Sequence, residues 1–381
     1  MKIDNDKIFE LLDTILDPIT GIGLVKAKKV YNVELNDDKI NFDLVTNDVE
    51  PIVKGDLNLA IIDLFANSLP QYKVNVNMVS WENITPQKSG NNDASITSMV
   101  KPLTDLGSNP LPQVKNIIAI ASGKGGVGKS SVAVNLAISL KDKGFRVGLI
   151  DGDMYGPSIP TMLNLNGKRP GLTKLYGADK LLPIEAFGIY TMSIGFFLEP
   201  DQAVILRGPK LDGVMRQFVK DVVWPELDYM VIDLPPGTGD VQLSLVQLLS
   251  VTGAIMVTTP QQVALDDAVK AMNMFLLSNV EVPILGVIEN MSWFETVELP
   301  GRKFYIFGQG GGKKLAEKGE TELLAQIPIF ESIREGGDDG VPVVLTDERV
   351  KTYYSELASS VDRRTNIRNE VLDPTKIVDR S

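Results

Sequence analysis

The pattern of apolar and polar positions first separates a small N-terminal unit. Between residues 1 and 82, apolar residues recur at helical spacing in two stretches and alternate with polar residues in three others. Asn36, Asp37 and Asp38 lie between the first two alternating runs and indicate a hairpin turn. The expected elements are helix, strand, strand, helix and strand over residues 5–16, 25–35, 39–45, 57–68 and 73–79. Residues 1–82 are therefore predicted to form a small α+β domain.

The rest of the chain divides into a polar stretch and a large unit. Residues 83–113 are polar and rich in proline and glycine, which predicts a flexible linker. From residue 114 onward, short apolar runs alternate with stretches of helical periodicity. Such runs fit strands that are buried on both faces. We therefore expect an α/β domain over residues 114–381, with a mostly parallel sheet covered by helices.

A glycine-rich segment lies between the first strand and the first helix of this large domain. The octapeptide GKGGVGKS, from Gly123 to Ser130, matches the pattern GxxxxGK[ST] without a mismatch. Glycines let backbone N–H groups surround a phosphate, Lys129 can reach the β- and γ-phosphates, and the Ser130 hydroxyl suits Mg²⁺. A plain glycine-rich turn is the alternative, but the flanking strand and helix favour nucleotide binding and a P-loop NTPase domain. The residues expected to bind it are Gly123, Gly125, Gly126, Val127, Gly128, Lys129, Ser130 and Ser131.

Carboxylates follow two later strands of the same domain. Asp151 and Asp153 come directly after one apolar run, and Asp233 ends another. Ligands of parallel sheets bind at the carboxyl ends of strands, where close carboxylates repel each other unless a cation lies among them. Mg²⁺ on a nucleotide supplies that cation, and Asp233 is expected to hold it through water. The alternative for the first pair is a turn with two solvated aspartates. Asp240 is expected to cap the next helix, with sensing of the γ-phosphate as its alternative role.

Composition limits the chemistry that this chain can perform. Its 381 residues contain no cysteine and no histidine. Disulfides, thiolate catalysis, zinc sites of the Cys/His kind and cysteine-held iron–sulfur clusters are therefore excluded for this chain. The formal net charge of −11 argues against a broad nucleic-acid surface, and the sequence has no apolar run of membrane-spanning length. We expect a cytoplasmic protein that binds neither membranes nor nucleic acids.

The glycine-rich segment also carries a family resemblance. KGGVGKS resembles the deviant Walker A loop of the SIMIBI ATPases, which include the nitrogenase iron protein and the Min and Par ATPases. The resemblance implies an ATP-hydrolysing homodimer in which Lys124 reaches the partner's nucleotide, as an arginine finger does. It also implies that Asp153 orients the attacking water, that Asp151 supports the site and that Asn290 reads the adenine edge. A turn asparagine is the alternative for Asn290. The expected catalytic residues are Lys124, Lys129 and Asp153, with ATP and Mg²⁺ as cofactors.

Further blocks narrow the resemblance to one group. Six of them are similar, in order, to the Mrp/ApbC group of iron–sulfur cluster carrier ATPases, and they read DGDMYGPSIP, LRGPK, DLPPGTGD, ENMSWF, IFGQGGGKKLA and QIPIFESIREGGDDGVPVV. The N-terminal segment DPITGIGLV resembles the MIP18-like (DUF59) domain of iron–sulfur assembly factors. These resemblances imply a carrier that delivers an iron–sulfur cluster, with apo-proteins or assembly factors as partners.

One segment departs from the pattern of that group. Between MSWF and YIFG, where many relatives have a CxxC pair, this chain reads ETVELPGRKF. Either it handles clusters through a cysteine-bearing partner or with non-cysteine ligands, or it has kept the ATPase without direct cluster binding. A MinD- or ParA-like positioning ATPase and a nucleotide-gated adaptor are the alternative functions. Residues 362–381 combine mixed charges with a proline, which disfavours membrane attachment through a basic amphipathic helix.

Overall fold

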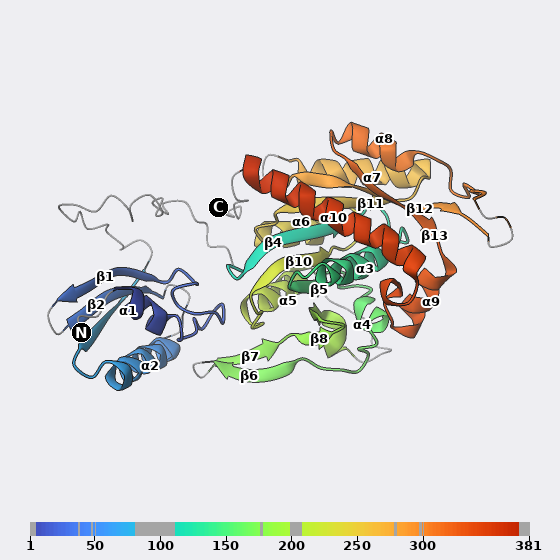
Figure 1. The fold of residues 1–381 in the computed structure, drawn as a ribbon. Coiled ribbons are helices and arrows are strands. Elements are labelled where there is room, and N and C mark those ends of the chain that lie inside the picture. The colour runs from blue at the N-terminus through green and yellow to red at the C-terminus, as the bar shows by residue number, and fades with distance from the viewer. Residues whose placement is uncertain are drawn as a thin grey trace.

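The computed structural model describes residues 5–36, 39–46, 49, 51–80, 111–175, 178–198, 208–277, 280–296, 299 and 301–372. Figure 1 shows a small N-terminal sheet with its helices beside a much larger sheet. The predicted linker, residues 83–113, lies outside the described residues except for its last three positions.

The N-terminal unit confirms the predicted order of elements. They are α1 (Asn5–Leu12), β1 (Val30–Asn36), β2 (Lys39–Val45), α2 (Pro51–Ser68) and β3 (Lys73–Val79). Strand β2 pairs antiparallel with β1 and parallel with β3. Apolar side chains of both helices pack on β2, with Phe42 and Phe65 fully buried at the centre. Strand β1 begins five residues later than predicted because turns occupy the segment before it, with Ala27 N–H bonded to the Gly23 carbonyl.

The large unit is built on one eight-stranded sheet. Its strands are β4 (Val114–Ala121), β5 (Val147–Asp151), β8 (Ile184–Ala186), β9 (Ile189–Ser193), β10 (Leu227–Asp233), β11 (Gly253–Thr258), β12 (Ile284–Phe294) and β13 (Leu323–Ile329). They are ordered β13-β12-β11-β4-β10-β5-β9-β8. Every neighbouring pair is parallel except β8 and β9. The predicted α/β fold with a mostly parallel sheet is therefore confirmed.

The short strands between β5 and β10 were not predicted from the sequence. A separate hairpin consists of β6 (Gly171–Leu175) and β7 (Ala178–Leu182), and β8 and β9 form a second hairpin at the sheet edge. Three of these four strands consist mostly of exposed and partly buried positions, without a full apolar run. The hydrophobic pattern alone gives no strong strand signal for such elements.

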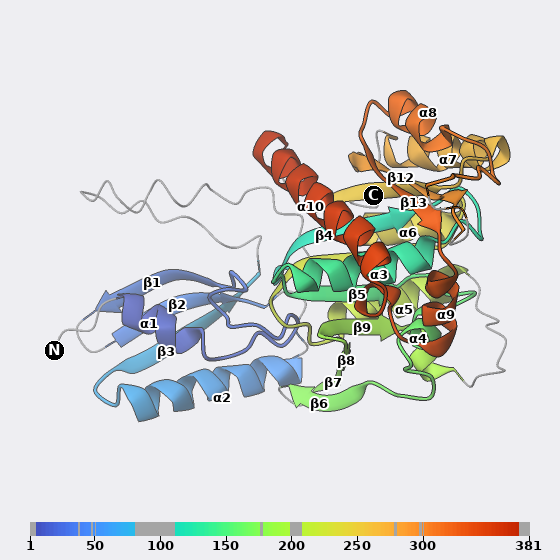
Figure 2. The same ribbon diagram turned by 45° about the vertical axis from the view of Figure 1, so that its right-hand side comes forward.

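Helices cover both faces of the large sheet, as Figures 1 and 2 show. One face carries α3 (Lys129–Asp142), α4 (Ile159–Met162), α9 (Glu331–Asp339), η3 (Val343–Leu345) and α10 (Glu348–Val371). The other carries α5 (Gly208–Lys220), α6 (Asp240–Leu248), α7 (Gln262–Phe275) and α8 (Gly311–Lys318). A short turn of helix, η2 (Ile194–Phe197), follows β9. Each face buries its own apolar cluster, which explains why the central strands are apolar on both sides.

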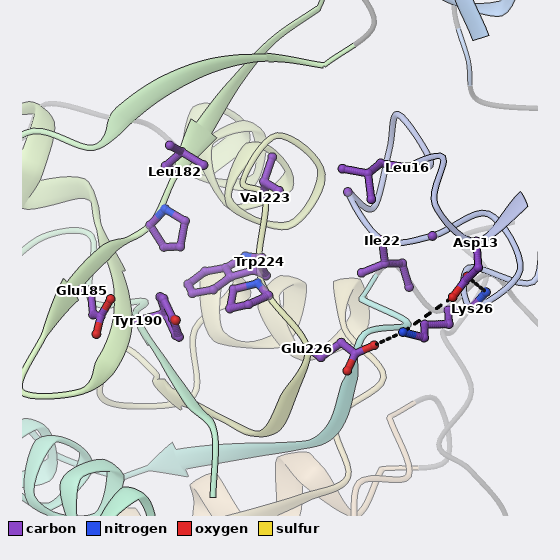
Figure 3. A pocket seen from close by; sticks show the side chains of 14 residues that line it. Asp13, Leu16, Ile22, Lys26, Leu182, Glu185, Tyr190, Val223, Trp224 and Glu226 are labelled. Carbon is purple, nitrogen blue, oxygen red and sulfur yellow. Dashed lines mark hydrogen bonds and ion pairs between the residues drawn. The ribbon is translucent and has the colours of Figure 1, made fainter. Parts of the chain in front are cut away.

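The two units contact each other at the amino end of β10. Lys26 lies 3.6 Å from Asp13 in its own unit and 3.2 Å from Glu226, the residue before β10. The backbone of Gly21 lies against Val223, since a Cβ at Gly21 would come within 2.6 Å of a valine methyl. A cavity of about 550 Å³ lies between the units. Figure 3 shows apolar side chains on both of its walls. This contact lies at the opposite end of β10 from Asp233.

Candidate nucleotide-binding site

Three strand ends bring the predicted site residues together. Strand β10 lies between β4 and β5, and its last residue, Asp233, is paired with Ile120 on one side and Asp151 on the other. Strand β4 ends at Ala121, one residue before the glycine-rich loop, and α3 begins at Lys129. Loop, aspartates and helix start therefore meet at the carboxyl edge of the sheet, where ligands of such sheets bind.

The loop's backbone has the conformation that phosphate binding requires. Gly126 and Gly128 have φ angles of 81° and 84°, a region that favours glycine. A Cβ on Gly126 would meet no atom within 4 Å, so this part of the loop faces open space. Gly128 is the N-cap of α3, and no side chain caps the helix. The N–H groups at this helix start are available to an anion, and the helix dipole favours it.

Lys129 and Ser130 both converge on Asp233. The Lys129 ammonium donates to Asp233 Oδ1 at 2.5 Å, and the Ser130 hydroxyl donates to Oδ2 at 2.6 Å. Lys129 and Asp233 are almost fully buried. Burial raises the pKa of Asp233, while the Lys129 charge and the two hydrogen bonds oppose that shift. One polar cluster therefore contains Lys129, predicted to bind phosphate, and Ser130 and Asp233, both predicted to hold Mg²⁺.

Asp151 and Asp153 lie beside this cluster. Burial, followed by the charge of Asp233, raises the pKa of Asp151 to about 8, against the opposing effects of the Ser193 hydrogen bond and the Lys129 charge. The side chain of Asp151 is fully buried, so the solvated turn considered as an alternative does not describe it. Asp153 is partly exposed, and its carboxylate accepts a hydrogen bond from Gly156 N–H at 3.3 Å. Only Asp153 of this pair is accessible to a bound ligand.

Asn290 contacts the loop from the other side. It lies inside β12 rather than in a turn, because this strand continues through Phe294. Its amide nitrogen donates to the Val127 carbonyl at 2.9 Å. A Cβ on Gly128 would come within 2.2 Å of the same nitrogen. The residue expected to read adenine is therefore already bonded to the phosphate loop.

Two predicted residues have less defined surroundings. Lys124 is exposed, and in the described part of the chain its side chain forms no ion pair within 4 Å. Asp240 is the first residue of α6, and the N-cap is Gly239. The expectation that Asp240 caps this helix was therefore wrong by one position, since glycine is also tolerated at the cap.

A role for Ser122, the residue before the glycine-rich loop, was not predicted from the sequence. The Ser122 hydroxyl donates to the Lys124 carbonyl at 3.0 Å, and the Ser122 carbonyl accepts from Gly237 N–H at 2.9 Å. Ser122 therefore links the glycine-rich loop to the segment after β10. Its signal in the sequence was only its place directly before the motif.

The described residues contain neither an acidic cluster for a metal ion nor a membrane-spanning helix. Within them, no group of three or more acidic side chains is arranged to hold a metal ion. Magnesium prefers several oxygen ligands, so here it would need phosphate and water oxygens besides Ser130. Among the helices of the described ranges, none combines the length and the apolar character needed to cross a membrane.

Comparisons with known proteins agree with this geometry. The model of a family described as NUBPL iron-transfer P-loop NTPase matches residues 113–362. A second family, described as iron-sulfur cluster assembly protein, matches residues 5–78. The second match covers the N-terminal sheet and its helices.

Individual relatives match over most of their length. An iron-sulfur cluster carrier protein of Synechocystis sp. is 40% identical over 348 residues, which make up 90% of this chain and 92% of the relative. One from Deinococcus radiodurans is 40% identical over 373 residues, or 95% of this chain and 97% of the relative. A solved nucleotide-binding protein of Archaeoglobus fulgidus in complex with ADP is 34% identical, with a TM-score of 0.55 over 63% of this chain and 93% of that one. The chain therefore belongs to the NUBPL iron-transfer P-loop NTPase family.

Proposed function

We propose that this protein is an ATP-hydrolysing iron–sulfur cluster carrier or assembly factor that acts without cysteine ligands of its own. The observation that carries the ATPase part is the convergence of Lys129 and Ser130 on Asp233 at the end of the glycine-rich loop. The carrier part is supported by the family and by the relatives named iron-sulfur cluster carrier protein.

Each residue of the site has a separate task in this proposal. The loop N–H groups from Gly123 to Gly128 surround the phosphates, and Lys129 turns from Asp233 to the β- and γ-phosphates. Ser130 would hold Mg²⁺ directly and Asp233 would hold it through water, and the metal would supply positive charge that offsets the charge of the phosphates. Asp153 orients the attacking water, which its partial exposure and its place beside Asp233 allow. Asn290 fixes the loop and faces the adenine, with Ser131 in the first turn of α3.

Lys124 is proposed to act across a homodimer. It is the exposed cation of the loop, and its backbone carbonyl is held by the Ser122 hydroxyl. A lysine presented in this way at the edge of a phosphate site can add positive charge to a partner's nucleotide, as an arginine finger does. The glycine-rich loops of the two subunits would therefore face each other in the dimer. We place the protein in the cytoplasm.

The cluster is a cargo for which this chain offers no thiolate or imidazole ligand. Oxygen ligands are poorly matched to iron–sulfur clusters, which proteins bind through cysteine or, less often, histidine. We therefore expect the cluster to be held by cysteines of an apo-protein or assembly factor while this ATPase changes conformation.

The ATPase part is tested by turnover of substituted proteins. Lys124→Ala should lower ATP turnover by about 10³-fold or more, the range assigned to an arginine finger, and Lys129→Ala should also lower it because it removes the cation proposed to meet the β- and γ-phosphates. Lys318→Ala, an exposed lysine in the last turn of α8, is the matched control and should leave turnover unchanged. Equal rates of ATP turnover for all three variants and the wild type would contradict the roles assigned to Lys129 and Lys124.

The carrier part is tested by anaerobic reconstitution with iron and sulfide. Absorbance and transfer to an apo-protein are measured for this protein alone and with cysteine-containing candidate partners. We expect ATP-dependent transfer only in the mixtures. Absence of binding and transfer in both settings would refute the carrier role and leave the ATPase role standing.

A further inference from the structure

We propose that Ser193 is a positioning residue for hydrolysis, because its hydroxyl holds Asp151 and thereby fixes the loop that carries Asp153. The loop between β5 and α4, residues 152–158, is called the Asp153 loop below. The inference rests on the proposed role of Asp153 and adds a residue that no motif in the sequence marks.

The fold brings Ser193 to Asp151 across a strand pair. Ser193 ends β9, Asp151 ends β5, and the two residues are paired in the parallel register. Both side chains are fully buried. The Ser193 hydroxyl donates to Asp151 Oδ2 at 3.0 Å. A buried carboxyl group needs such partners, because each unmet acceptor costs free energy.

Asp151 in turn holds both ends of the Asp153 loop. Its Oδ1 accepts a hydrogen bond from Asp153 N–H at 3.2 Å, and its Oδ2 accepts one from Ile159 N–H at 3.3 Å. The backbone at the start and at the end of the loop is therefore bonded to a single carboxyl group. Ser193 provides the shortest of these three contacts, and without it the carboxyl group keeps only the two longer bonds from the loop backbone.

The same hydroxyl also fixes the segment that packs on the loop. Ser193 Oγ accepts a hydrogen bond from Gly195 N–H at 3.0 Å and so caps η2. Gly195 lies close to two prolines at the start of α4, since a Cβ there would be 2.9 Å from Pro160 Cγ in its first turn and 3.4 Å from Pro157 Cβ in the Asp153 loop. A hydroxyl can donate and accept at once, whereas the methyl group of alanine can do neither.

The expected consequence is a loss of turnover without a loss of nucleotide binding. A displacement of a reacting group by about 1 Å can cost on the order of 10²-fold in rate. The hydrogen bonds of the Ser193 hydroxyl go to Asp151 and Gly195 rather than to Lys129 or the rest of the phosphate-binding loop, so the KM for ATP should change little. If Ser193 served only general stability, its loss would lower the amount of folded enzyme and leave the kcat and KM of the folded fraction unchanged.

Thr191 offers a matched control on the same strand. It lies two residues before Ser193, is fully buried, and its hydroxyl has no hydrogen-bond partner among the described residues. Ser193→Ala should lower kcat by about 10- to 100-fold with KM within about threefold, whereas Thr191→Val should leave both constants near wild type. Equal kcat values for the two variants would overturn the proposal.

A second measurement does not depend on turnover. Because the chain has no cysteine, Tyr155→Cys creates a single site for a nitroxide label on the Asp153 loop, at a position that is 57% exposed. Electron paramagnetic resonance should show a more mobile label when Ser193→Ala is added, and no change when Thr191→Val is added. If Ser193→Ala does not fold, Asp151→Asn replaces it, with the same expected gain in mobility.

The two readouts separate this inference from the proposed function. An unchanged label in the Ser193→Ala protein overturns the anchoring role even if turnover falls. If Ser193→Ala increases the mobility of the label but the wild type hydrolyses no ATP, the anchoring contact is supported. The absence of hydrolysis then counts against the proposed function.

Discussion

Replacing Asp233 with asparagine isolates the ion pair at the centre of the candidate site. The Lys129 ammonium lies 2.5 Å from Asp233 Oδ1, and the two side chains are 6% and 0% exposed. At an effective dielectric constant of about 20, opposite charges at this separation attract each other by roughly 6–7 kcal/mol. The substitution removes that attraction and leaves the ammonium group buried. We expect the free energy of unfolding to fall by about 3–5 kcal/mol, as for other buried pairs that lose one partner.

The same substitution should change ATP binding in the opposite direction. In the wild type, a phosphate has to compete with Asp233 for Lys129, whereas in Asp233→Asn the lysine is free to meet it. In the absence of Mg²⁺, we therefore expect the variant to bind ATP more than tenfold tighter, a gain above about 1.4 kcal/mol. Hydrolysis should fall, because the carboxylate proposed to hold the metal through water is gone.

Urea unfolding followed by tryptophan fluorescence, together with calorimetric titration of ATP in EDTA, measures both effects. Glu322→Gln is the control, because its pairs with Arg363 at 2.7 Å and Arg364 at 3.8 Å are partly exposed to solvent, and their loss should cost less than about 1 kcal/mol. The double variant Lys129→Met/Asp233→Asn should recover part of the stability. The reasoning is refuted if Asp233→Asn stays within about 1 kcal/mol of the wild type and binds ATP no more tightly.

Three further substitutions test the surroundings. Partial burial raises the pKa of Asp228 but hydrogen bonds from basic neighbours lower it to about 2, so the stability lost in Asp228→Asn at pH 7 should shrink between about pH 4 and pH 2 in urea titrations. Gly128→Ala should weaken calorimetric ATP binding at least tenfold, because φ is 84° and the new Cβ meets Asn290. Gly144→Ala is its control, with φ of 93° but open space, and should leave binding unchanged. Val223→Glu should separate the two units and raise the radius of gyration in small-angle scattering, without changing ATP binding.

Local sequence determined how much of the site could be predicted. The glycine-rich loop is specified by consecutive residues, and Asp233 could be placed beside it because the carboxyl ends of parallel strands meet at one edge. The polar cluster itself depends on β10 lying next to β4, which joins residues 104 positions apart in the Lys129–Asp233 bond. Strand order of this kind is not contained in hydrophobic periodicity. For the same reason, the bond from Asn290 to the Val127 carbonyl was not expected.

The residues that position the site were the least predictable. Ser193 has no motif and lies in a hairpin whose first strand is only three residues long. Its partner, Asp151, is 42 positions away, and their contact exists only because β9 pairs with β5. The residues that bind phosphate follow recurrent spacings in the sequence. The side chains that position them depend on which strands are neighbours in one particular sheet.

The Lys129–Asp233 pair should make ATP and Mg²⁺ depend on each other. A phosphate that takes Lys129 leaves Asp233 buried beside Asp151 without a countercharge, and a cation that takes Asp233 leaves Lys129 buried in the same way. Only the two ligands together replace both charges, so each should raise the affinity for the other by the same factor. Titrations of ATP at increasing Mg²⁺ should show this coupling in the wild type and lose most of it in Asp233→Asn. Equal ATP affinity with and without Mg²⁺ in the wild type would show that the pair does not couple the two ligands.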